Sequence, residues 1–303
     1  MAHDSGQTMA AVDPEWLRGL VLRAGSVLEQ ASQRRHELRV DHKGRVDLVT
    51  EIDLEIQELL VTELKRNSGT DCIVAEEGDR PETGECERVW YVDPVDGTTN
   101  FVHGYPFSAV SVARWVGGEP EVGIVYAPLL DELFFARAGR GATLERPGAG
   151  QPPRAIQASS CASLDDALLA TGFPYHRGKT ARLNLAICAH ALDRVRGIRR
   201  AGSAALDICH VALGRLDGYW EMGLAPWDFA AAALIAREAG AVVSDFRGTP
   251  ELLEARRIVA AAPRLHGELI GLLQRAHARP DLDVLGAAPD AALPLHGLLP
   301  GEC

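Results

Sequence analysis

Two carboxylates stand three residues apart around a proline in the segment DPVDGTTNF, residues 93–101, which follows the apolar run RVWYV. Proline disfavours helical geometry in the residue before it, so Asp93 is predicted to end a strand. Gly97 permits a tight turn, and the Thr-Thr-Asn after it offers hydroxyls and free amides where a helix could begin. This arrangement suits divalent cations together with an anion. A polar turn with a capping aspartate would use the same residues, so the rest of the chain has to decide.

Further acids end apolar segments elsewhere. Glu76 and Glu77 follow the run DCIVA, and Asp228 opens the alanine-rich segment DFAAAALIAREAG. Each has a structural interpretation as well, since Asp228 could cap a helix, and Thr50 with Asp53 matches a capping box. Taken together, these oxygen ligands with no Cys or His beside them favour hard cations such as Mg²⁺ or Mn²⁺ over zinc. Two such ions could polarise a phosphoryl group and generate hydroxide, while a helix start after Gly97 holds phosphate oxygens.

Composition narrows the class of protein. The chain has 303 residues, of which 47% are hydrophobic and 24% charged, and this is typical of a globular protein. A net charge of −11 argues against nucleic acid as a partner, because the phosphate backbone favours basic surfaces. No signal peptide is evident at the N-terminus, and no uninterrupted apolar run reaches membrane-spanning length. We therefore expect a cytoplasmic protein with no membrane partner.

The cysteines carry a separate expectation. Six of them, at positions 72, 86, 161, 188, 209 and 303, are scattered through the chain with no C-x-x-C pair. Such scatter is typical of reduced thiols in a cytosolic protein rather than of a disulfide framework or a zinc site. All six are expected to be free.

Periodicity predicts the elements that position the acids in the first half of the chain. Helices are expected from Asp13-Pro14, with the proline in the first turn, and from near Thr50. The runs DCIVAEE and RVWYVDP read as buried strands that deliver carboxylates at their C-terminal ends. Segments 107–128 and 131–142 alternate or cluster β-forming residues between glycine-rich turns, which indicates a meander.

The second half alternates strands with helices. Strands are predicted at 166–173, 216–222 and 241–246, and helices at 182–195, 203–213, 228–239 and 264–277. The proline- and glycine-rich patch at 146–154 is the best internal boundary. The fold class is therefore α/β in two subdomains, residues 13–147 and 148–278, between a flexible N-terminus (1–12) and a loose tail (279–303).

Several of these motifs together resemble the inositol monophosphatase family, magnesium-dependent and lithium-sensitive phosphatases of sugar phosphates. DPVDGTTNF and WDFAAAALI resemble its two signature motifs, and KGRVDLVTEID, IVAEEG, GSAALDI and GYWEMGLAPWD match in the same order. The resemblance runs from roughly Pro14 to Ala278. It implies a layered α/β/α/β/α sandwich of the inositol monophosphatase and fructose-1,6-bisphosphatase type, and a homodimer.

The resemblance also implies roles for particular residues. Two or three Mg²⁺ ions, with Mn²⁺ as a substitute, would be held by five groups: Glu76, Asp93, the Val95 carbonyl, Asp96 and Asp228. Asp53 and Thr98 would orient and deprotonate the attacking water, and Glu76 would belong to the same catalytic centre. The phosphate and hydroxyls of the substrate would meet Asp96, Gly97, Thr98, Ser203, Ala204 and Glu221. Lys43, in a KGxxD loop, would lie near the metals.

Three functions are compatible with the resemblance. The first is a Mg²⁺-dependent phosphatase of a small polyol or sugar monophosphate, inositol 1-phosphate above all, in which activated water attacks in line. The second is a phosphatase of the same mechanism that acts on histidinol phosphate or fructose 1,6-bisphosphate; these substrates stay open because the residues that would select them lie in loops that the sequence does not align. The third is a regulatory binding protein on this fold; its signs would be a broken metal set or a basic surface, and neither occurs.

Overall fold

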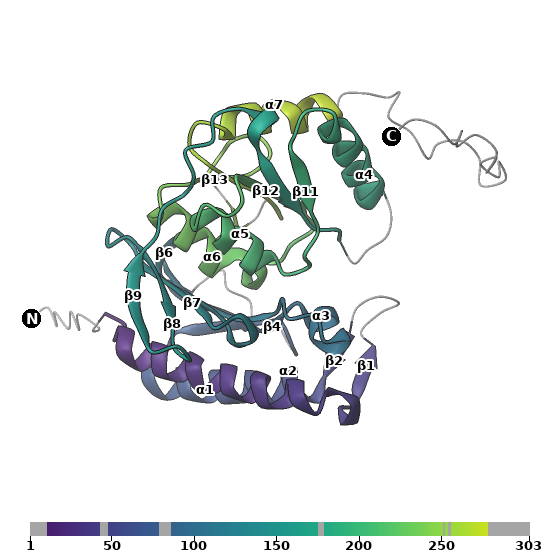
Figure 1. The fold of residues 1–303 in the computed structure, drawn as a ribbon. Helices are drawn as coiled ribbons and strands as arrows, with labels where there is room; N and C mark the ends of the chain where they lie inside the picture. The colour runs from purple at the N-terminus through teal and green to yellow at the C-terminus, as the bar shows by residue number, and fades with distance from the viewer. Residues whose placement is uncertain are drawn as a thin grey trace, which may run out of the picture.

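Five layers of secondary structure make up the protein. The structure, a computed structural model, describes residues 11–42, 48–78, 86–174, 179–250, 252–253 and 256–277. A seven-stranded and a five-stranded sheet alternate with three pairs of helices, so that the layers run helix, sheet, helix, sheet, helix (Figure 1). This confirms the predicted α/β/α/β/α sandwich.

The first helical layer is formed by α1 (Pro14–Gln33) and α2 (Glu51–Ser68). The Asp13 side chain accepts a hydrogen bond from Glu15 N at 3.0 Å and so caps α1 at the predicted position. Thr50 and Asp53 form the predicted capping box of α2. Both helices bury one apolar stripe against the outer face of the larger sheet, where it meets Trp90 and Val92.

The larger sheet joins the predicted meander to the two strands predicted before it, and its last two strands were not predicted. Its order is β3 (Cys72–Ala75), β4 (Arg88–Asp96), β5 (Ala109–Val116), β6 (Glu119–Ala127), β7 (Glu132–Arg137), β8 (Ala142–Arg146) and β9 (Gln151–Ala155). Strand β3 is parallel to β4, and all the other pairs are antiparallel. Two prolines in β9 are tolerated because this strand lies at the sheet edge.

Strand β4 does not end at Asp93, which corrects the prediction. It continues to Asp96, and its register with β5 shifts between Asp93 and Asp96. Pro94 has no N–H to give to the ladder, and the irregularity leaves it outside the pairing. The backbone around Asp93 is extended, as predicted, and both aspartates therefore belong to one strand.

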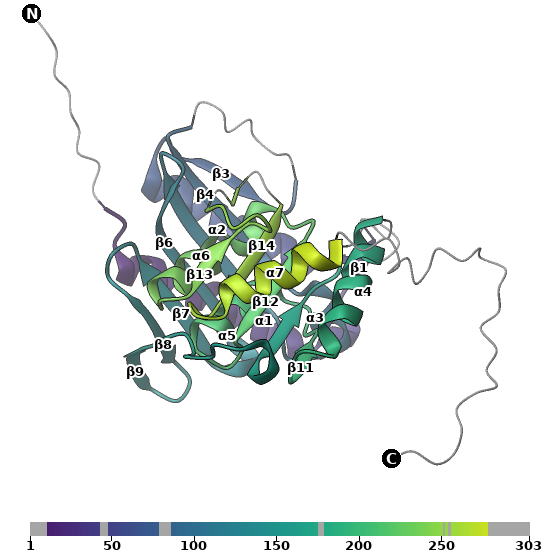
Figure 2. The same cartoon turned by 90° about the horizontal axis from the view of Figure 1, so that it is seen from above.

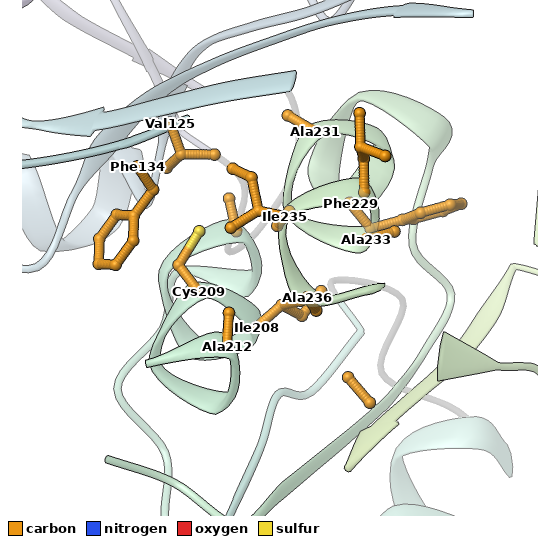
Figure 3. Close-up of a cluster of buried hydrophobic side chains, with 14 of the residues drawn as sticks. Val125, Phe134, Ile208, Cys209, Ala212, Phe229, Ala231, Ala233, Ile235 and Ala236 are labelled. Carbon is orange, nitrogen blue, oxygen red and sulfur yellow. The ribbon is translucent and has the colours of Figure 1, made fainter. Parts of the chain in front are cut away.

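The central layer consists of α5 (Ala204–Ala212) and α6 (Pro226–Glu238), packed between the two sheets. Helix α6 begins two residues before the predicted position. Figure 3 shows Val125 and Phe134 of the larger sheet pointing toward Cys209 and Ile235 of these helices. Small side chains allow the close approach: a Cβ at Gly123 would lie 2.7 Å from the Ala231 carbonyl oxygen.

The smaller sheet has the order β11 (Gly197–Arg199), β10 (Leu168–Thr171), β12 (Gly218–Met222), β14 (Arg257–Ala261), β13 (Val242–Ser244). Strand β10 is parallel to β11 and β12, whereas β14 is antiparallel to β12 and β13. Helices α4 (Lys179–Leu192) and α7 (His266–His277) cover its outer face (Figure 2). Strands β11 and β14 were not predicted.

Short elements complete the described chain. Strands β1 (Val40–His42) and β2 (Leu48–Thr50) pair antiparallel, and α3 (Thr98–His103) follows β4. Three 3-10 turns occupy Arg35–Glu37, Pro128–Leu130 and Leu164–Asp166. None of the described helices is both long and apolar enough to cross a membrane.

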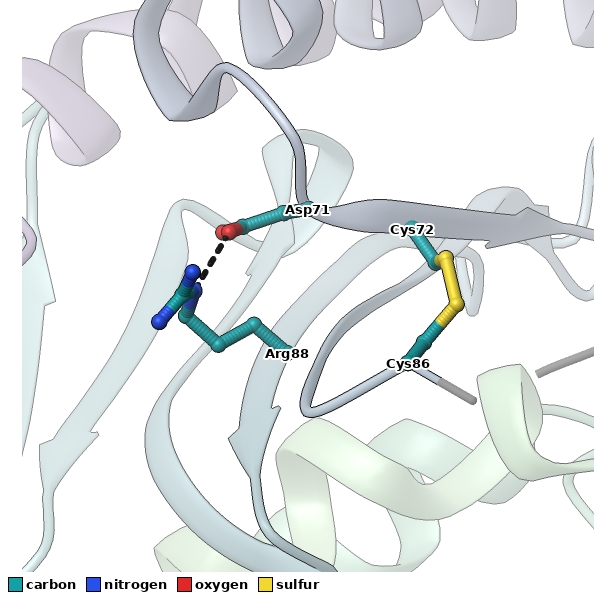
Figure 4. The surroundings of a disulfide bond; sticks show 4 residues. All are labelled: Asp71, Cys72, Cys86 and Arg88. Carbon is teal, nitrogen blue, oxygen red and sulfur yellow. Dashed lines mark hydrogen bonds and ion pairs between the residues drawn. A yellow bond between two sulfur atoms is a disulfide. The ribbon is translucent and has the colours of Figure 1, made fainter. Parts of the chain in front are cut away.

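The cysteine expectation is wrong for one pair. Cys72 and Cys86 form a disulfide, with Cα atoms 6.1 Å apart, beside the ion pair of Asp71 and Arg88 (Figure 4). Cys72 opens β3 and Cys86 precedes β4, so the parallel pairing of the two strands brings the sulfurs together. Cys161, Cys188 and Cys209 are free thiols, and Cys303 lies outside the described residues.

Candidate active site

The turn after β4 has the geometry that the sequence predicts. Gly97 has φ 93°, a left-handed conformation that a side chain disfavours, and α3 begins at the next residue. A Cβ at this glycine would lie 2.9 Å from the Phe107 carbonyl oxygen and 3.2 Å from that of Gly202. Asn100 donates to the carbonyls of Phe107, at 2.7 Å, and Ala201, at 2.8 Å. The turn therefore joins β4 to the start of α5.

Four acids from separate parts of the chain interact at this turn. Burial raises the pKa of Asp93 well above its usual value, and the charges of Glu76, Asp96 and Asp228 raise it further. The pKa of Asp228 is also raised well above its usual value, mainly by burial and next by the charge of Glu76. Asp93 is 1% exposed and Asp96 is 8% exposed. The structure therefore brings these predicted metal ligands within electrostatic reach of one another.

Backbone and hydroxyl donors orient each carboxylate. Asp93 accepts a hydrogen bond from Val95 N at 3.0 Å, and Asp228 accepts one from Ala225 N at 2.7 Å. Asp96 accepts three, from Ser203 Oγ at 2.5 Å, Ala205 N at 2.7 Å and Ala204 N at 3.3 Å. Ser203 and Ala204, predicted to meet the substrate, thus hold Asp96 in place. Asp228 lies in the first turn of α6 and caps it as N3, not as its first residue.

The kind of ligand atoms in this cluster of acids decides which cation it could bind. Within the described ranges, no three His, Cys, Asp or Glu side chains converge at metal-ligand spacing. The acids nevertheless supply only oxygen ligands, and burial together with neighbouring carboxylates raises the pKa of Asp93 and of Asp228, so a bound cation would relieve both burial and repulsion. The residues present therefore fit a hard divalent ion of the Mg²⁺ type.

The metal-free protein is expected to lose stability as the pH rises from about 4 to about 7. Burial raises the pKa of Asp96 from 3.8 to about 6 and that of Glu221 from 4.5 to about 7. An acid whose pKa is higher in the folded state holds its proton more tightly there. Its contribution to the stability of the fold is therefore fully present below the pKa of the unfolded state and is lost as the pH rises through the pKa of the folded state. Each group then destabilises the fold by about 3 kcal/mol.

Thermal unfolding in EDTA measures this effect, with a higher Tm expected at about pH 5 than at about pH 8. Added Mg²⁺ should raise the Tm mainly at the higher pH, because its ligands must be deprotonated. A Tm that is independent of both pH and Mg²⁺ would contradict the burial of these acids around a cation site.

A second group of contacts joins α2 to the turn. Asp53 is fully buried, and its Oδ2 accepts hydrogen bonds from Thr50 N at 2.8 Å and from Thr50 Oγ1 at 2.5 Å. Thr98 Oγ1 lies 2.9 Å from Asp53 Oδ1 and 3.0 Å from the Val95 carbonyl oxygen. The capping box therefore fixes one carboxylate oxygen and leaves the other to polarise the Thr98 hydroxyl. The position of Asp53 is therefore compatible with both interpretations of it, as a helix cap and as the partner of Thr98.

A pocket opens beside these acids, at the N-terminal end of α5. Asp96, Ser203, Ala204 and Asp228 form part of its lining, together with Glu221 from β12. Glu221 accepts a hydrogen bond from the Tyr219 hydroxyl. A Cβ at Gly172 would overlap the Glu221 carboxylate, so a side chain there would displace that carboxylate.

Some polar residues of this region were not predicted from the sequence, and the prediction for one residue is not tested. Tyr219 and Asn100 stand inside the quoted motifs, so their polar side chains were a signal that could have been used. Arg200 and Asp207 also line the pocket and were not singled out. Lys43 lies outside the described residues. The catalytic and binding roles assigned to individual residues stay predictions.

The fold and the site define a layered phosphatase-type sandwich with a buried, acidic pocket between its two sheets. A model of the inositol monophosphatase family matches residues 11–278, and the chain belongs to that family. It is 40% identical over 242 residues to the Nus factor SuhB of Vibrio cholerae, covering 80% of this chain and 88% of that protein. It is 44% identical over 232 residues to the inositol-1-monophosphatase of Synechocystis sp., covering 76% of this chain and 78% of that protein.

Solved structures agree with this assignment. The suppressor protein SuhB from Bartonella henselae superposes with a TM-score of 0.79 at 34% identity, covering 86% of this chain and 98% of the other. An inositol monophosphatase from Anabaena gives a TM-score of 0.74 at 36% identity, covering 85% and 93%. The chain is therefore a phosphatase of the inositol monophosphatase type.

Proposed function

We propose that this protein is a Mg²⁺-dependent phosphomonoesterase that hydrolyses a small polyol phosphate, with inositol 1-phosphate as its substrate. The single observation that carries the proposal is the electrostatic interaction of acids from β4, α6 and the end of β3 beside the Asp53–Thr98 pair. Membership of the family supports the same activity. Polar side chains in the lining of the adjoining pocket support a polyol as the substrate.

In this proposal, bound Mg²⁺ would polarise the phosphoryl group and lower the pKa of the attacking water. Glu76, Asp93, the Val95 carbonyl, Asp96 and Asp228 would hold it. The Thr98 hydroxyl orients the water, accepting its proton at Oγ1 while passing its own toward Asp53 Oδ1. Amides of Gly97 and Thr98 receive the phosphate oxygens. Ser203 and the α5 amides keep Asp96 directed at the same volume.

Phosphate release from a panel of esters tests the proposal. Inositol 1-phosphate, histidinol phosphate and fructose 1,6-bisphosphate would be compared at one Mg²⁺ concentration, with EDTA as the control. The expected result is Mg²⁺-dependent release with the highest kcat/KM for inositol 1-phosphate. A higher value for either alternative would reassign the substrate, and release that persists in EDTA would remove the metal mechanism.

A second candidate function is regulatory binding. It is favoured by several relatives that are named Nus factors, from Vibrio cholerae, Pasteurella multocida and Escherichia coli. A stoichiometric macromolecular partner, recovered equally by the wild type and by Asp93→Asn, would support it. If nothing is recovered and turnover is high, the enzymatic role stands alone.

The proposal further includes a cytoplasmic homodimer that lithium inhibits. Light scattering should give twice the mass of the chain, and LiCl should lower phosphate release. The expectation of a cytoplasmic protein rested partly on free cysteines, and the Cys72–Cys86 disulfide removes that support. Cell fractionation therefore has to test the location.

A further inference from the structure

One acid in the pocket has no role in the proposed chemistry. Asp207 lies on α5, one helical turn after Ser203, and its backbone N–H donates to the Ser203 carbonyl at 3.0 Å. Its side chain lines the pocket together with Glu221 and Arg200, although the residue as a whole is only 2% exposed. It therefore faces the space where the organic part of a substrate would lie.

The side chain of Asp207 has no protein partner among the residues that the structure describes. The other pocket acids are all hydrogen-bonded: Asp96 to Ser203, Asp228 to Ala225 N, and Glu221 to Tyr219. No hydrogen bond or ion pair reaches the Asp207 carboxyl within the described ranges. A buried polar group without a partner is costly, so its retention beside a pocket points to a ligand that supplies the missing donor.

The charges around Asp207 indicate what that donor is. Burial, followed by the charges of Glu221 and Asp96, raises the pKa of Asp207 well above its usual value, and only Arg200 opposes this shift. Arg200 is itself exposed, so solvent weakens its influence. The surroundings therefore disfavour added charge, and a hydroxyl of a polyol can donate a hydrogen bond to this carboxyl group without adding any.

We propose that Asp207 is a specificity-determining residue: its carboxyl group accepts a hydrogen bond from a hydroxyl on the carbon skeleton of the substrate. The inference rests on the proposed phosphatase function and deepens it. Asp207 acts on substrate choice and takes no part in attack on phosphorus. It favours phosphate esters that carry such a hydroxyl over esters that lack one.

Two substitutions test the acceptor oxygen. Asp207→Asn keeps an acceptor oxygen, so the KM for inositol 1-phosphate should stay within about twofold of the wild type. Asp207→Ala removes the acceptor, so the KM for inositol 1-phosphate should rise at least about tenfold while kcat changes little. The KM for 4-nitrophenyl phosphate, which has no hydroxyl to donate, should stay unchanged in Asp207→Ala.

Asp193→Ala is the matched control, because it makes the same truncation at an exposed position after α4. Asp207→Asn should also raise the Tm at neutral pH, because it replaces a buried acid of raised pKa with a neutral group. The proposal is overturned if Asp207→Ala keeps the KM for inositol 1-phosphate within about twofold of the wild type, or if it shifts the KM for 4-nitrophenyl phosphate equally.

Failure of the proposed function would look different. A wild-type protein with no Mg²⁺-dependent turnover of any ester would overturn the phosphatase proposal. Calorimetric titration with inositol 1-phosphate then still tests Asp207, since Asp207→Ala should weaken its Kd at least about tenfold. An unchanged Kd would overturn the role of Asp207 by itself.

Discussion

Asp93→Asn is expected to lower kcat for inositol 1-phosphate about a thousandfold in saturating Mg²⁺. Asp93 is buried at the centre of the acids, and its pKa responds to Glu76, Asp96 and Asp228 together. An amide of the same shape keeps the fold but removes the negative charge that both metal positions would share. Steady-state phosphate release, measured against Mg²⁺ concentration, gives kcat and the apparent metal affinity together.

The control for this substitution is Asp165→Asn, which neutralises an exposed aspartate before β10 and should leave kcat unchanged. The Tm of metal-free Asp93→Asn should equal or exceed that of the wild type, because a buried acid with a raised pKa has been replaced by a neutral group. Equal phosphate release from Asp93→Asn and the wild type would show that this carboxylate holds no catalytic ion.

Thr98→Val is expected to lower kcat about a hundredfold or more while leaving the affinity for Mg²⁺ close to that of the wild type. The substitution keeps the side-chain shape and removes the hydroxyl that lies 2.9 Å from Asp53 Oδ1. Water would lose its orienting group, whereas the carboxylates would stay in place. Activity assays and calorimetric titration with Mg²⁺ on the same preparation separate the two effects.

Thr143→Val is a suitable comparison, since Thr143 is half-buried on β8 and its hydroxyl makes only a long contact of 3.5 Å with the Phe135 carbonyl. Its kcat should match that of the wild type. If Thr98→Val retained full activity, the attacking water would have to be oriented by other groups, and the Asp53–Thr98 pair would be structural only.

Local signals account for the parts of the fold that the sequence predicted. Asp13 before Pro14 and the Thr50–Asp53 box fix helix starts through contacts within four residues, so one short segment contains the whole argument. Gly97 likewise allowed the tight turn to be predicted, and the structure shows it in the left-handed conformation. The acids at the ends of β3 and β4 were predictable because apolar runs of strand length stop there.

Contacts between distant segments account for what was missed. Strand β14 exists because it pairs with β12 and β13, and its sequence RIVAA carries no alternation of its own. The disulfide depends on the parallel pairing of β3 with β4, not on cysteine spacing. Asp96 is held by α5 across 107 residues or more. Asp207 looked like an ordinary helix residue until the fold placed it beside the pocket.

The central claim is that Glu76, Asp93, Asp96 and Asp228 hold divalent metal ions, and anomalous diffraction from crystals grown with Mn²⁺ tests it most directly. The account predicts at least two anomalous peaks roughly 4 Å apart, each bound by oxygens of these acids, with Asp93 between them. Peaks at other residues, or none at this cluster, would contradict it.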